Sequence, residues 1–421
     1  MNAKIIGVGG SSGKTSLTLL ISLILKEKYK VKQSGGKNSE VGLPLDILDI
    51  FVGNNSLYDW LRIIMLTMLR TFSSPKQYDY YIVEMGIDSP VEPKNMSYLL
   101  KIVTPDIAMV TNISLEHSQY FDDYVKEKDI DIREQEIIKL TAREESLLLR
   151  SLSKESMAIV NIDDYQIKQV LPDIAARKIS ISLQNKSADF YAKDIGIDLD
   201  KFLLEFIYDN KTYRILLHQP LPIHFAYEFL FALAVSTNLE IPLDSAISSI
   251  ENNFSLPPGR LSIFEGIKDT TLIDSSYNNA TLAPIIDILD LMQRFGGRRR
   301  KIGILGDMRE LGSMSKLNHE AVAKKIINSL DLVILIGPLM QNYVAPILEK
   351  NNFPFFSFLT FTAAKEKILG SIKKEDIVLV KGSQNTLFLE RAVEMLLADK
   401  KDISKLCRRG EFWDIKRSET P

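Results

Sequence analysis

Short runs of apolar residues alternate with longer helical patterns along the first half of this chain. These runs are continuous, which is typical of strands buried on both faces of a parallel sheet. We expect such strands at Lys4–Val8, Tyr80–Glu84, Ile107–Asn112 and Ala158–Ile162. Because helical patterns separate them, they predict an α/β fold with a doubly wound, mostly parallel sheet.

The pattern changes between Asp189 and Leu217, where apolar and polar residues alternate over short runs. This segment predicts a small antiparallel addition to the sheet. His224–Thr237, rich in Ala, Leu and Phe, then predicts a helix. Pro257-Pro258-Gly259 follows as the clearest linker signal in the chain.

Beyond this linker a second α/β pattern begins. We expect strands at Thr271–Ile273, Lys301–Leu305, Leu332–Ile336 and Ile377–Val380, with helices between them. The 421 residues are too many for one compact core. We therefore expect a first domain over residues 1–258 and a second, Rossmann-like α/β domain over 259–421. The charged tail from Asp402 is expected to fray.

Composition adds few constraints. The chain is 45% hydrophobic and 25% charged, as ordinary globular proteins are, and its net charge of -2 gives no reason to expect a nucleic-acid partner. The single cysteine, Cys407, excludes an intrachain disulfide and favours a reducing compartment. No secretion-signal pattern precedes the first strand, so we expect a cytoplasmic location.

One apolar segment stands apart. Trp60–Phe72 is strongly apolar, yet it carries Arg62 and Arg70 and is too short to span a bilayer. We expect a helix that packs on the core or on a partner subunit. Shallow insertion into a membrane surface is the alternative.

The start of the chain carries the most informative motif. The first strand leads into Gly10, Ser11, Ser12, Gly13, Lys14, Thr15 and Ser16, and then into an apolar helix. Backbone N–H groups of such a loop, at a helix N-terminus, favour a polyphosphate. Lys14 can reach the β and γ oxygens, and the hydroxyl of Thr15 or Ser16 can hold Mg²⁺. This motif predicts a P-loop type site for ATP or a relative.

Polar residues also follow other predicted strands. In open α/β sheets, ligands bind outside the carboxyl ends of the strands. Glu84 is therefore a candidate Mg²⁺ ligand, with a helix N-cap or a surface acid as alternatives. His117 is a candidate metal ligand or a structural histidine. Arg260, just past the linker, could close over a triphosphate or be a surface arginine. Asp274 could meet ribose or phosphate, or form an Asx-turn.

Nine motifs, in this order, resemble those of the Mur ligases, the ATP-dependent amide ligases of peptidoglycan precursor synthesis. The resemblance covers the chain from residue 4 to about residue 395. The motifs are Gly10–Thr15, Asn38–Pro44, Val83–Gly86, Thr111–His117, Asn161–Asp164, Pro258–Leu261, Ile273–Asn278, Gly306–Gly312 and Val380–Ser383.

The resemblance implies a two-step reaction that uses ATP and Mg²⁺. A carboxylate, such as that of a muramyl peptide, takes the γ-phosphate to give an acyl phosphate. An amine, such as D-alanyl-D-alanine, then displaces the phosphate. Phosphoryl transfer of this kind needs positioning and charge neutralisation. The resemblance assigns catalysis to Lys14, Glu84, His117 and Arg260, metal binding to Thr15, Glu84 and His117, and nucleotide contacts to Asp274, Tyr277 and Asn278.

Three departures from the family pattern bear on activity. The N-terminal domain that grips the UDP-sugar is not found before the first strand. Counting back from Ser151-Leu152 without gaps puts Glu145 where the family has a carbamylated lysine, and a shifted count puts Arg143 there. We expect Glu145 to reach Mg²⁺ only through a water or a backbone shift. Phe225 and Glu228 replace two asparagines, and Glu228 would need to bind a metal or the adenine amino group to be tolerated beside a triphosphate.

We therefore expect an acid–amine ligase that forms ADP and takes small-molecule substrates. One alternative is a Mur-like ligase for a carboxylate and amine outside peptidoglycan. The other is a catalytically weak nucleotide-binding subunit that docks on a partner through Trp60–Phe72.

Overall fold

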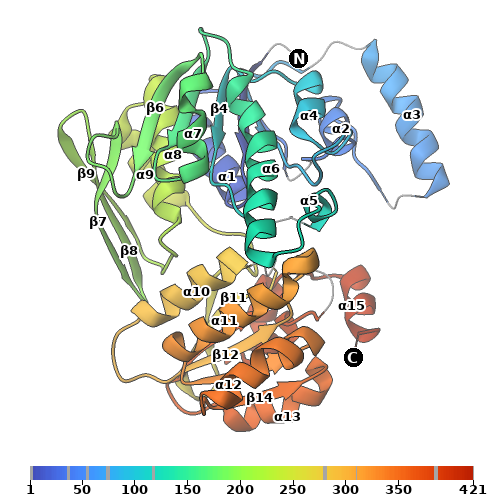
Figure 1. Cartoon of the computed structure of the whole chain (residues 1–421), viewed down its shortest axis with the longest axis vertical. Coiled ribbons are helices and arrows are strands. Elements are labelled where there is room, and N and C mark those ends of the chain that lie inside the picture. Colours follow the sequence, from blue (N-terminus) through green and yellow to red (C-terminus); the bar gives the residue numbers. More distant parts are fainter. Residues whose placement is uncertain are drawn as a thin grey trace. The chain divides into compact units, whose positions relative to one another are not determined.

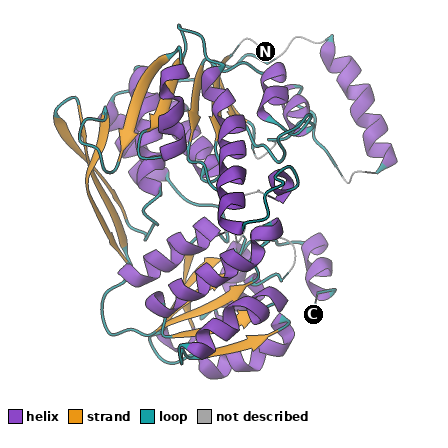
Figure 2. Ribbon diagram, in the orientation of Figure 1, coloured by secondary structure: helices purple, strands orange, loops and turns teal. Residues whose placement is uncertain are grey.

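The computed structural model describes residues 3–35, 38–53, 56–72, 76–115, 119–277, 282–309, 311–383 and 387–420. They form two compact units. The first comprises Met1–Ile195, Leu203–Leu216 and His224–Phe254, and the second comprises Gly196–Phe202, Leu217–Ile223 and Ser255–Pro421. Figure 1 traces the chain through both units, and Figure 2 shows that each combines strands with surrounding helices.

The first sheet has the order β2-β3-β1-β4-β5-β6-β7-β8-β9. Its strands from β2 to β7 are parallel, which confirms the predicted sheet. The strands are β1 (Lys4–Gly9), β2 (Val31–Gln33), β3 (Tyr80–Glu84), β4 (Ile107–Val110), β5 (Met157–Asn161), β6 (Arg177–Ser182), β7 (Phe190–Asp198), β8 (Lys201–Tyr208) and β9 (Lys211–Leu217).

The last three strands of this sheet form the antiparallel addition that the alternating pattern predicts. Two residues separate β7 from β8, and two separate β8 from β9. Connections this short join antiparallel neighbours only. Between β8 and β9, Asp209 and Asn210 have φ of 49° and 58°, the left-handed angles of a tight hairpin turn.

The helices of the first unit fall into two packed groups, as a doubly wound fold requires. Helices α1, α8 and α9 contact one another, and α6 contacts α4 and α7. The bounds are α1 (Lys14–Leu25), α2 (Gly42–Ile47), α3 (Leu57–Thr71), α4 (Met96–Ile102), α5 (Gln119–Asp122), α6 (Ile130–Arg150), α7 (Tyr165–Val170), α8 (Phe225–Asn238) and α9 (Leu243–Asn253).

Helix α3 is the apolar helix predicted around Trp60–Phe72. Among the described residues, only one side of it is covered, where Ile63 packs against Leu45 and Ile50. Its other side exposes Leu57, Tyr58, Trp60, Leu61, Ile64, Met65, Met68, Leu69 and Phe72. Within the described ranges, no helix has the length and apolar character needed to cross a membrane.

The second unit has a sheet in the order β10-β11-β15-β12-β13-β14, parallel except for β10. This confirms a second α/β fold. The elements are β10 (Ser262–Gly266), β11 (Thr270–Ser275), α10 (Leu282–Arg294), β12 (Lys301–Gly306), α11 (Ser315–Ser329), β13 (Leu332–Ile336), α12 (Ala345–Lys350), β14 (Phe355–Phe358), α13 (Phe361–Ser371), β15 (Ile377–Lys381), α14 (Glu390–Leu396) and α15 (Glu411–Ser418).

The prediction that the tail frays from Asp402 is wrong. The Arg408 side chain is fully buried and forms an ion pair with Glu390 of α14, at 2.5 Å. Its guanidinium also donates to the Ser276 carbonyl at 3.0 Å. The charges of this part of the tail are therefore paired inside the unit, and α15 follows them.

Candidate active site

The Gly/Ser segment after β1 is a loop that leads directly into α1. Gly10 has a φ of 113° and Gly13 a φ of 78°, angles that other residues rarely adopt. A Cβ at Gly10 would collide with Thr111, and one at Gly13 would lie 2.8 Å from the Glu228 carboxylate. Because Gly13 has no side chain to cap α1, the first N–H groups of this helix are left for an anion.

The segment after β4 holds this phosphate loop in shape. The Ser12 backbone N–H donates to Asn112 Oδ1 at 3.0 Å, and the Thr111 hydroxyl donates to the Ser12 carbonyl at 2.6 Å. The Ser114 N–H donates to the Ser11 hydroxyl at 2.8 Å. The sequence analysis names Thr111–His117 as a motif but assigns a role in the site only to His117. The signal for the others was their place at the end of β4, the strand beside β1.

Lys14 folds back over the loop. Its Nζ donates to the Gly10 carbonyl at 2.5 Å and to the Ser11 carbonyl at 3.0 Å. The ammonium group therefore lies at the phosphate loop, where it can meet the oxygens of a polyphosphate.

Glu84 meets the first turn of α1. It lies opposite Val8 in the parallel pairing of β3 with β1, and its residue exposure is 4%. The Thr15 hydroxyl donates to Glu84 Oε2 at 3.0 Å, and Asn38 donates to Oε1 at 2.9 Å. Glu84 is thus neither a surface acid nor a helix N-cap.

A hydroxyl and a carboxylate are the oxygen donors that Mg²⁺ takes together with waters and phosphate oxygens, so the Thr15–Glu84 pair fits this ion. In the part of the chain that the structure describes, no three or more His, Cys, Asp or Glu side chains gather as a metal cluster. A Mg²⁺ site here would depend on this pair and on the nucleotide.

Glu145 reaches the phosphate loop from α6. Its Oε2 accepts the Gly10 N–H at 2.8 Å, and the residue is 2% exposed. The short side chain therefore brings a carboxylate to the loop itself. A second carboxylate, Glu228 of α8, lies against Gly13 and is 3.9 Å from His224 Nε2. Both carboxyl groups lie where a triphosphate would bring negative charge, and their ionised forms would be tolerable there only with cations between them and the phosphates.

In the second unit, Arg260 and Tyr277 come together. The Tyr277 N–H donates to the Gly259 carbonyl at 3.1 Å, and the Arg260 guanidinium lies 5.7 Å from the centre of the Tyr277 ring. The linker glycine permits this approach, because a Cβ at Gly259 would lie 2.7 Å from Tyr277 Cβ.

Asp274 lies in the core of the second unit. Its Oδ1 accepts the Ser276 N–H at 3.0 Å, which is the Asx-turn that the sequence left as an alternative. Burial raises the pKa of Asp274; Glu390 also raises it, while the Ser276 hydrogen bonds and Arg408 lower it. The buried tail residue Cys407 lies nearby, 3.7 Å from the Ser276 hydroxyl.

Two predicted site residues, His117 and Asn278, lie outside the described residues. Sequence reasoning missed the Arg408–Glu390 pair, for which the only signal was a run of charges in the tail.

Comparisons with known proteins agree with this arrangement. The Mur ligase middle domain matches residues 8–236, and the glutamate ligase domain of Mur ligases matches residues 259–384. UDP-N-acetylmuramoyl-tripeptide–D-alanyl-D-alanine ligase of Buchnera aphidicola subsp. Baizongia pistaciae is 26% identical over 412 residues, which cover 94% of this chain and 76% of that protein.

Two solved structures share the fold. MurF from Acinetobacter baumannii aligns with a TM-score of 0.73 and 19% identity, over 93% of this chain and 76% of that one. MurF ligase from Thermotoga maritima, in complex with ADP, aligns with a TM-score of 0.71 and 20% identity, over 96% and 81%. The match to the middle domain alone spans more than half of the chain. The chain therefore belongs to the Mur ligase family.

Proposed function

We propose that the chain is an ATP-dependent ligase that adds D-alanyl-D-alanine, or a similar amine, to a peptidoglycan precursor peptide. The observation that carries the proposal is the Thr15–Glu84 pair, 3.0 Å apart, at the phosphate loop of a Mur ligase. The named activity of the Buchnera relative, which aligns with 94% of this chain, supports the choice of substrates.

The phosphate loop, Gly10 to Ser16, binds the polyphosphate of ATP in this proposal. Its backbone N–H groups and the start of α1 offer positive potential, and Lys14 exchanges its two carbonyl partners for phosphate oxygens. These groups act by positioning and charge neutralisation rather than by covalent chemistry.

Thr15 and Glu84 are the proposed holders of Mg²⁺, with Glu145 and His117 as further candidates. When bound, Mg²⁺ supplies positive charge to the β and γ oxygens of ATP. Glu228 lies close enough to Gly13 to face the nucleotide as well.

In the first step, an oxygen of the substrate carboxylate forms a bond to the γ-phosphorus, and the bond to the leaving ADP oxygen breaks. In the second, the amine attacks the acyl carbon, phosphate leaves with the bonding electron pair, and the amine loses a proton. Arg260 is the proposed stabiliser of the transferring phosphoryl group. Tyr277, Asn278 and Asp274 are proposed nucleotide contacts, with Asp274 acting through the turn that it holds.

ADP and phosphate release tests this proposal. The purified chain is incubated with ATP, Mg²⁺, UDP-N-acetylmuramoyl peptides and D-alanyl-D-alanine, and the peptide product is detected by mass spectrometry. We expect turnover only when both the carboxylate and the amine are present. Turnover with another carboxylate or amine instead would favour a Mur-like ligase outside peptidoglycan.

The second candidate is a nucleotide-binding subunit with little turnover. The buried carboxylates Glu145 and Glu228 at the phosphate loop favour it. ATP binding measured by calorimetry, without ADP release for any substrate pair, would support this candidate against the ligase.

The proposal places the reaction in the cytoplasm, where ATP is available, and assigns the exposed face of α3 to contact with a partner protein or a membrane surface. The nine exposed apolar side chains of that face support such a contact. Sedimentation at two protein concentrations tests for contact with a protein, and flotation with anionic vesicles tests for contact with a membrane surface.

A further inference from the structure

The segment after β2 contains a motif, Asn38–Pro44, that the proposed function leaves without a role. Because β2 pairs in parallel with β3, the residues after β2 come to the carboxyl end of β3. The Ser34 N–H donates to the Ile82 carbonyl at 3.0 Å, and the Ser34 hydroxyl accepts the Glu84 N–H at 3.1 Å. The start of this segment is therefore attached to the strand that ends in Glu84.

Asn38 contacts the end of β3 with both its backbone and its side chain. Its carbonyl accepts the Gly86 N–H at 3.3 Å, and its Nδ2 donates to Glu84 Oε1 at 2.9 Å. The missing side chain of Gly86 permits this approach, because a Cβ there would lie 2.9 Å from Asn38 Nδ2. One residue thus holds both the segment after β3 and the carboxylate at the end of the strand.

The two oxygens of the Glu84 carboxylate have different partners. Oε2 accepts from the Thr15 hydroxyl at 3.0 Å, while Oε1 accepts from the Asn38 amide. The last torsion of a glutamate side chain has a broad minimum, so hydrogen bonds at the two oxygens decide its orientation. A neutral amide donor also leaves the carboxylate its negative charge, which a lysine or arginine partner would offset.

A cation at the phosphate loop would act differently on these two partners. The Thr15 hydroxyl has lone pairs and can become a ligand of the ion, whereas the NH₂ group of Asn38 only donates hydrogen bonds. Asn38 can therefore keep its bond to Oε1 while Oε2 and the Thr15 hydroxyl turn to the ion. Removing partners that orient a metal ligand in this way typically weakens metal binding about 10- to 100-fold.

We propose that Asn38 is a positioning residue for Mg²⁺, which holds the Glu84 carboxylate so that Oε2, beside the Thr15 hydroxyl, receives the ion. This inference rests on the proposed function, in which Thr15 and Glu84 hold Mg²⁺. Asn38 acts through Glu84 and is not itself a ligand.

Asn38→Ala in the full chain tests the proposal. The variant loses the amide but keeps the backbone carbonyl that accepts the Gly86 N–H. Mn²⁺ serves as the probe in place of Mg²⁺, and water-proton relaxation measures its Kd in the complex with the chain and ADP. We expect this Kd to rise about tenfold or more. The Kd for ADP without metal should change less than about twofold, because the phosphate loop is intact. Asn38→Leu, of similar shape but without a donor, should behave in the same way.

Asn252→Ala is the matched control for losing an asparagine. Asn252 is an exposed residue of the same unit, and its amide donates to the Ser248 hydroxyl at 3.1 Å. We expect its Kd for Mn²⁺ to equal that of the unmodified chain.

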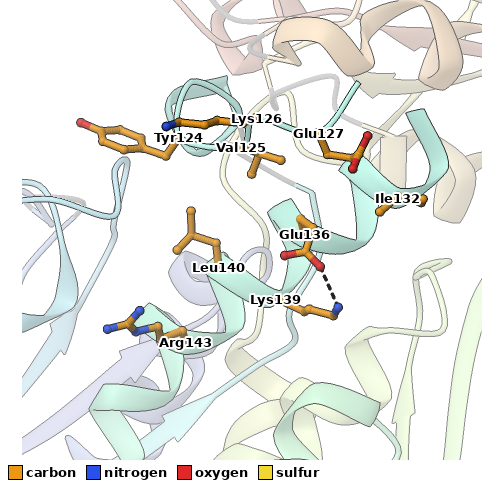
Figure 3. Close-up of a pocket in the computed structure, with 9 residues that line it drawn as sticks. All are labelled: Tyr124, Val125, Lys126, Glu127, Ile132, Glu136, Lys139, Leu140 and Arg143. Carbon is orange, nitrogen blue, oxygen red and sulfur yellow. Dashed lines mark hydrogen bonds and ion pairs between the residues drawn. The ribbon is translucent and has the colours of Figure 1, made fainter. Parts of the chain in front are cut away.

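Glu136→Gln is the control for Mn²⁺ held elsewhere. Glu136 and Glu127 line a pocket of about 630 Å³ between the segment 124–127 and α6, and Glu136 pairs there with Lys139 at 2.8 Å (Figure 3). Neither Asn38 nor Glu84 lines this pocket. We expect an unchanged Kd for Mn²⁺. A loss of Mn²⁺ binding as large as in Asn38→Ala would overturn the assignment to Glu84.

The same substitution in a chain that already carries Glu84→Gln shows whether Asn38 acts through the carboxylate. In that background, Asn38→Ala should weaken Mn²⁺ binding little further, because the group that it orients has lost its charge. Equal weakening in both backgrounds would overturn the positioning role. A Kd for Mn²⁺ in Asn38→Ala that matches the unmodified chain would overturn it as well.

The Mn²⁺ measurement does not require turnover, so it separates this inference from the ligase function. If the unmodified chain binds Mn²⁺ with ADP but turns over no substrate pair, the ligase function fails, and the Asn38→Ala result still decides the positioning role. If the unmodified chain does not bind Mn²⁺ with ADP, the positioning role is overturned. In an active chain, Asn38→Ala should raise the Mg²⁺ concentration for half-maximal activity about tenfold, with a smaller change in kcat at saturating Mg²⁺.

Discussion

Glu84 and Asp274 hold the same position in two similar sheets, yet their surroundings differ. Each carboxylate lies at or near the carboxyl end of a buried parallel strand, β3 or β11. Glu84 faces the hydroxyl of Thr15 at the phosphate loop. Asp274 instead accepts a hydrogen bond from Ser276, two residues away, and is fully buried.

The difference between them comes from what covers each strand end. The start of α1 lies at the end of β3, and the first N–H groups of this helix are left for a ligand. Around the end of β11 lies the tail of the chain, whose Arg408 donates to the Ser276 carbonyl and pairs with Glu390. A strand-end carboxylate is therefore a functional candidate only after the segment that covers it is known.

The largest effect is expected from removing the tail's buried cation. Arg408→Met leaves the Glu390 carboxylate buried without its main partner, in a pair whose side chains are both fully buried. We expect the free energy of unfolding of the second unit to fall by about 3–5 kcal/mol, as for other broken buried ion pairs. Urea denaturation followed by far-UV circular dichroism measures this change.

Arg409→Met is the matched control, because Arg409 pairs with the more exposed Glu394, and such pairs contribute about 0–1 kcal/mol. Cys407 provides a second readout. Burial raises the pKa of its thiol to about 11, so it should react slowly with thiol reagents at pH 8. Arg408 lowers this pKa, so a faster reaction in Arg408→Met would report opening of the destabilised tail rather than a more acidic thiol. Equal stability losses in the two arginine variants would show that the tail does not depend on the buried pair.

The next effect concerns catalysis in the first unit. Lys14→Ala removes the ammonium group from the phosphate loop without opening the core, since Lys14 contacts only loop carbonyls through its Nζ. We expect kcat to fall about 10²- to 10³-fold, as when other charge-stabilising donors are removed, with unfolding unchanged. Lys26→Ala, at the exposed end of α1, is the control. A kcat within a few-fold of the unmodified chain would contradict the phosphate-loop assignment.

The local pattern of apolar and polar residues predicts most of the fold and the part of the site that lies in the first unit. The continuous apolar run Tyr80–Glu84 predicts β3 with the bounds observed, because a strand buried on both faces has little room for polar residues. The contacts of Glu145 with Gly10 and of Arg408 with Ser276 could not be predicted in this way. Each contact joins residues more than 100 positions apart. Each depends on how a helix or the tail packs, and the periodic pattern of apolar residues within a segment does not determine this packing.

A smaller effect is expected at Glu145. Glu145→Gln keeps an oxygen that can accept the Gly10 N–H, so the loop should hold its shape, but the negative charge is lost. If Glu145 helps to hold Mg²⁺, the Mg²⁺ concentration for half-maximal activity should rise about tenfold. Glu144→Gln, on the same helix, is the control. An unchanged Mg²⁺ requirement would show that Glu145 only stabilises the conformation of the phosphate loop and does not bind Mg²⁺.

The smallest effect is expected from bicarbonate. In relatives that rely on a carbamylated lysine, bicarbonate supplies the carboxylate of that group; here Glu145 already brings a carboxylate to the phosphate loop, 2.8 Å from the Gly10 nitrogen. We expect ADP release to be the same in degassed buffer and in buffer with added bicarbonate. Stimulation by bicarbonate would contradict this and would point to a carbamate on another lysine: Lys126, Lys128 or Lys139. Single Lys→Arg variants, which keep the positive charge but cannot form the carbamate, would then identify the residue by loss of the stimulation.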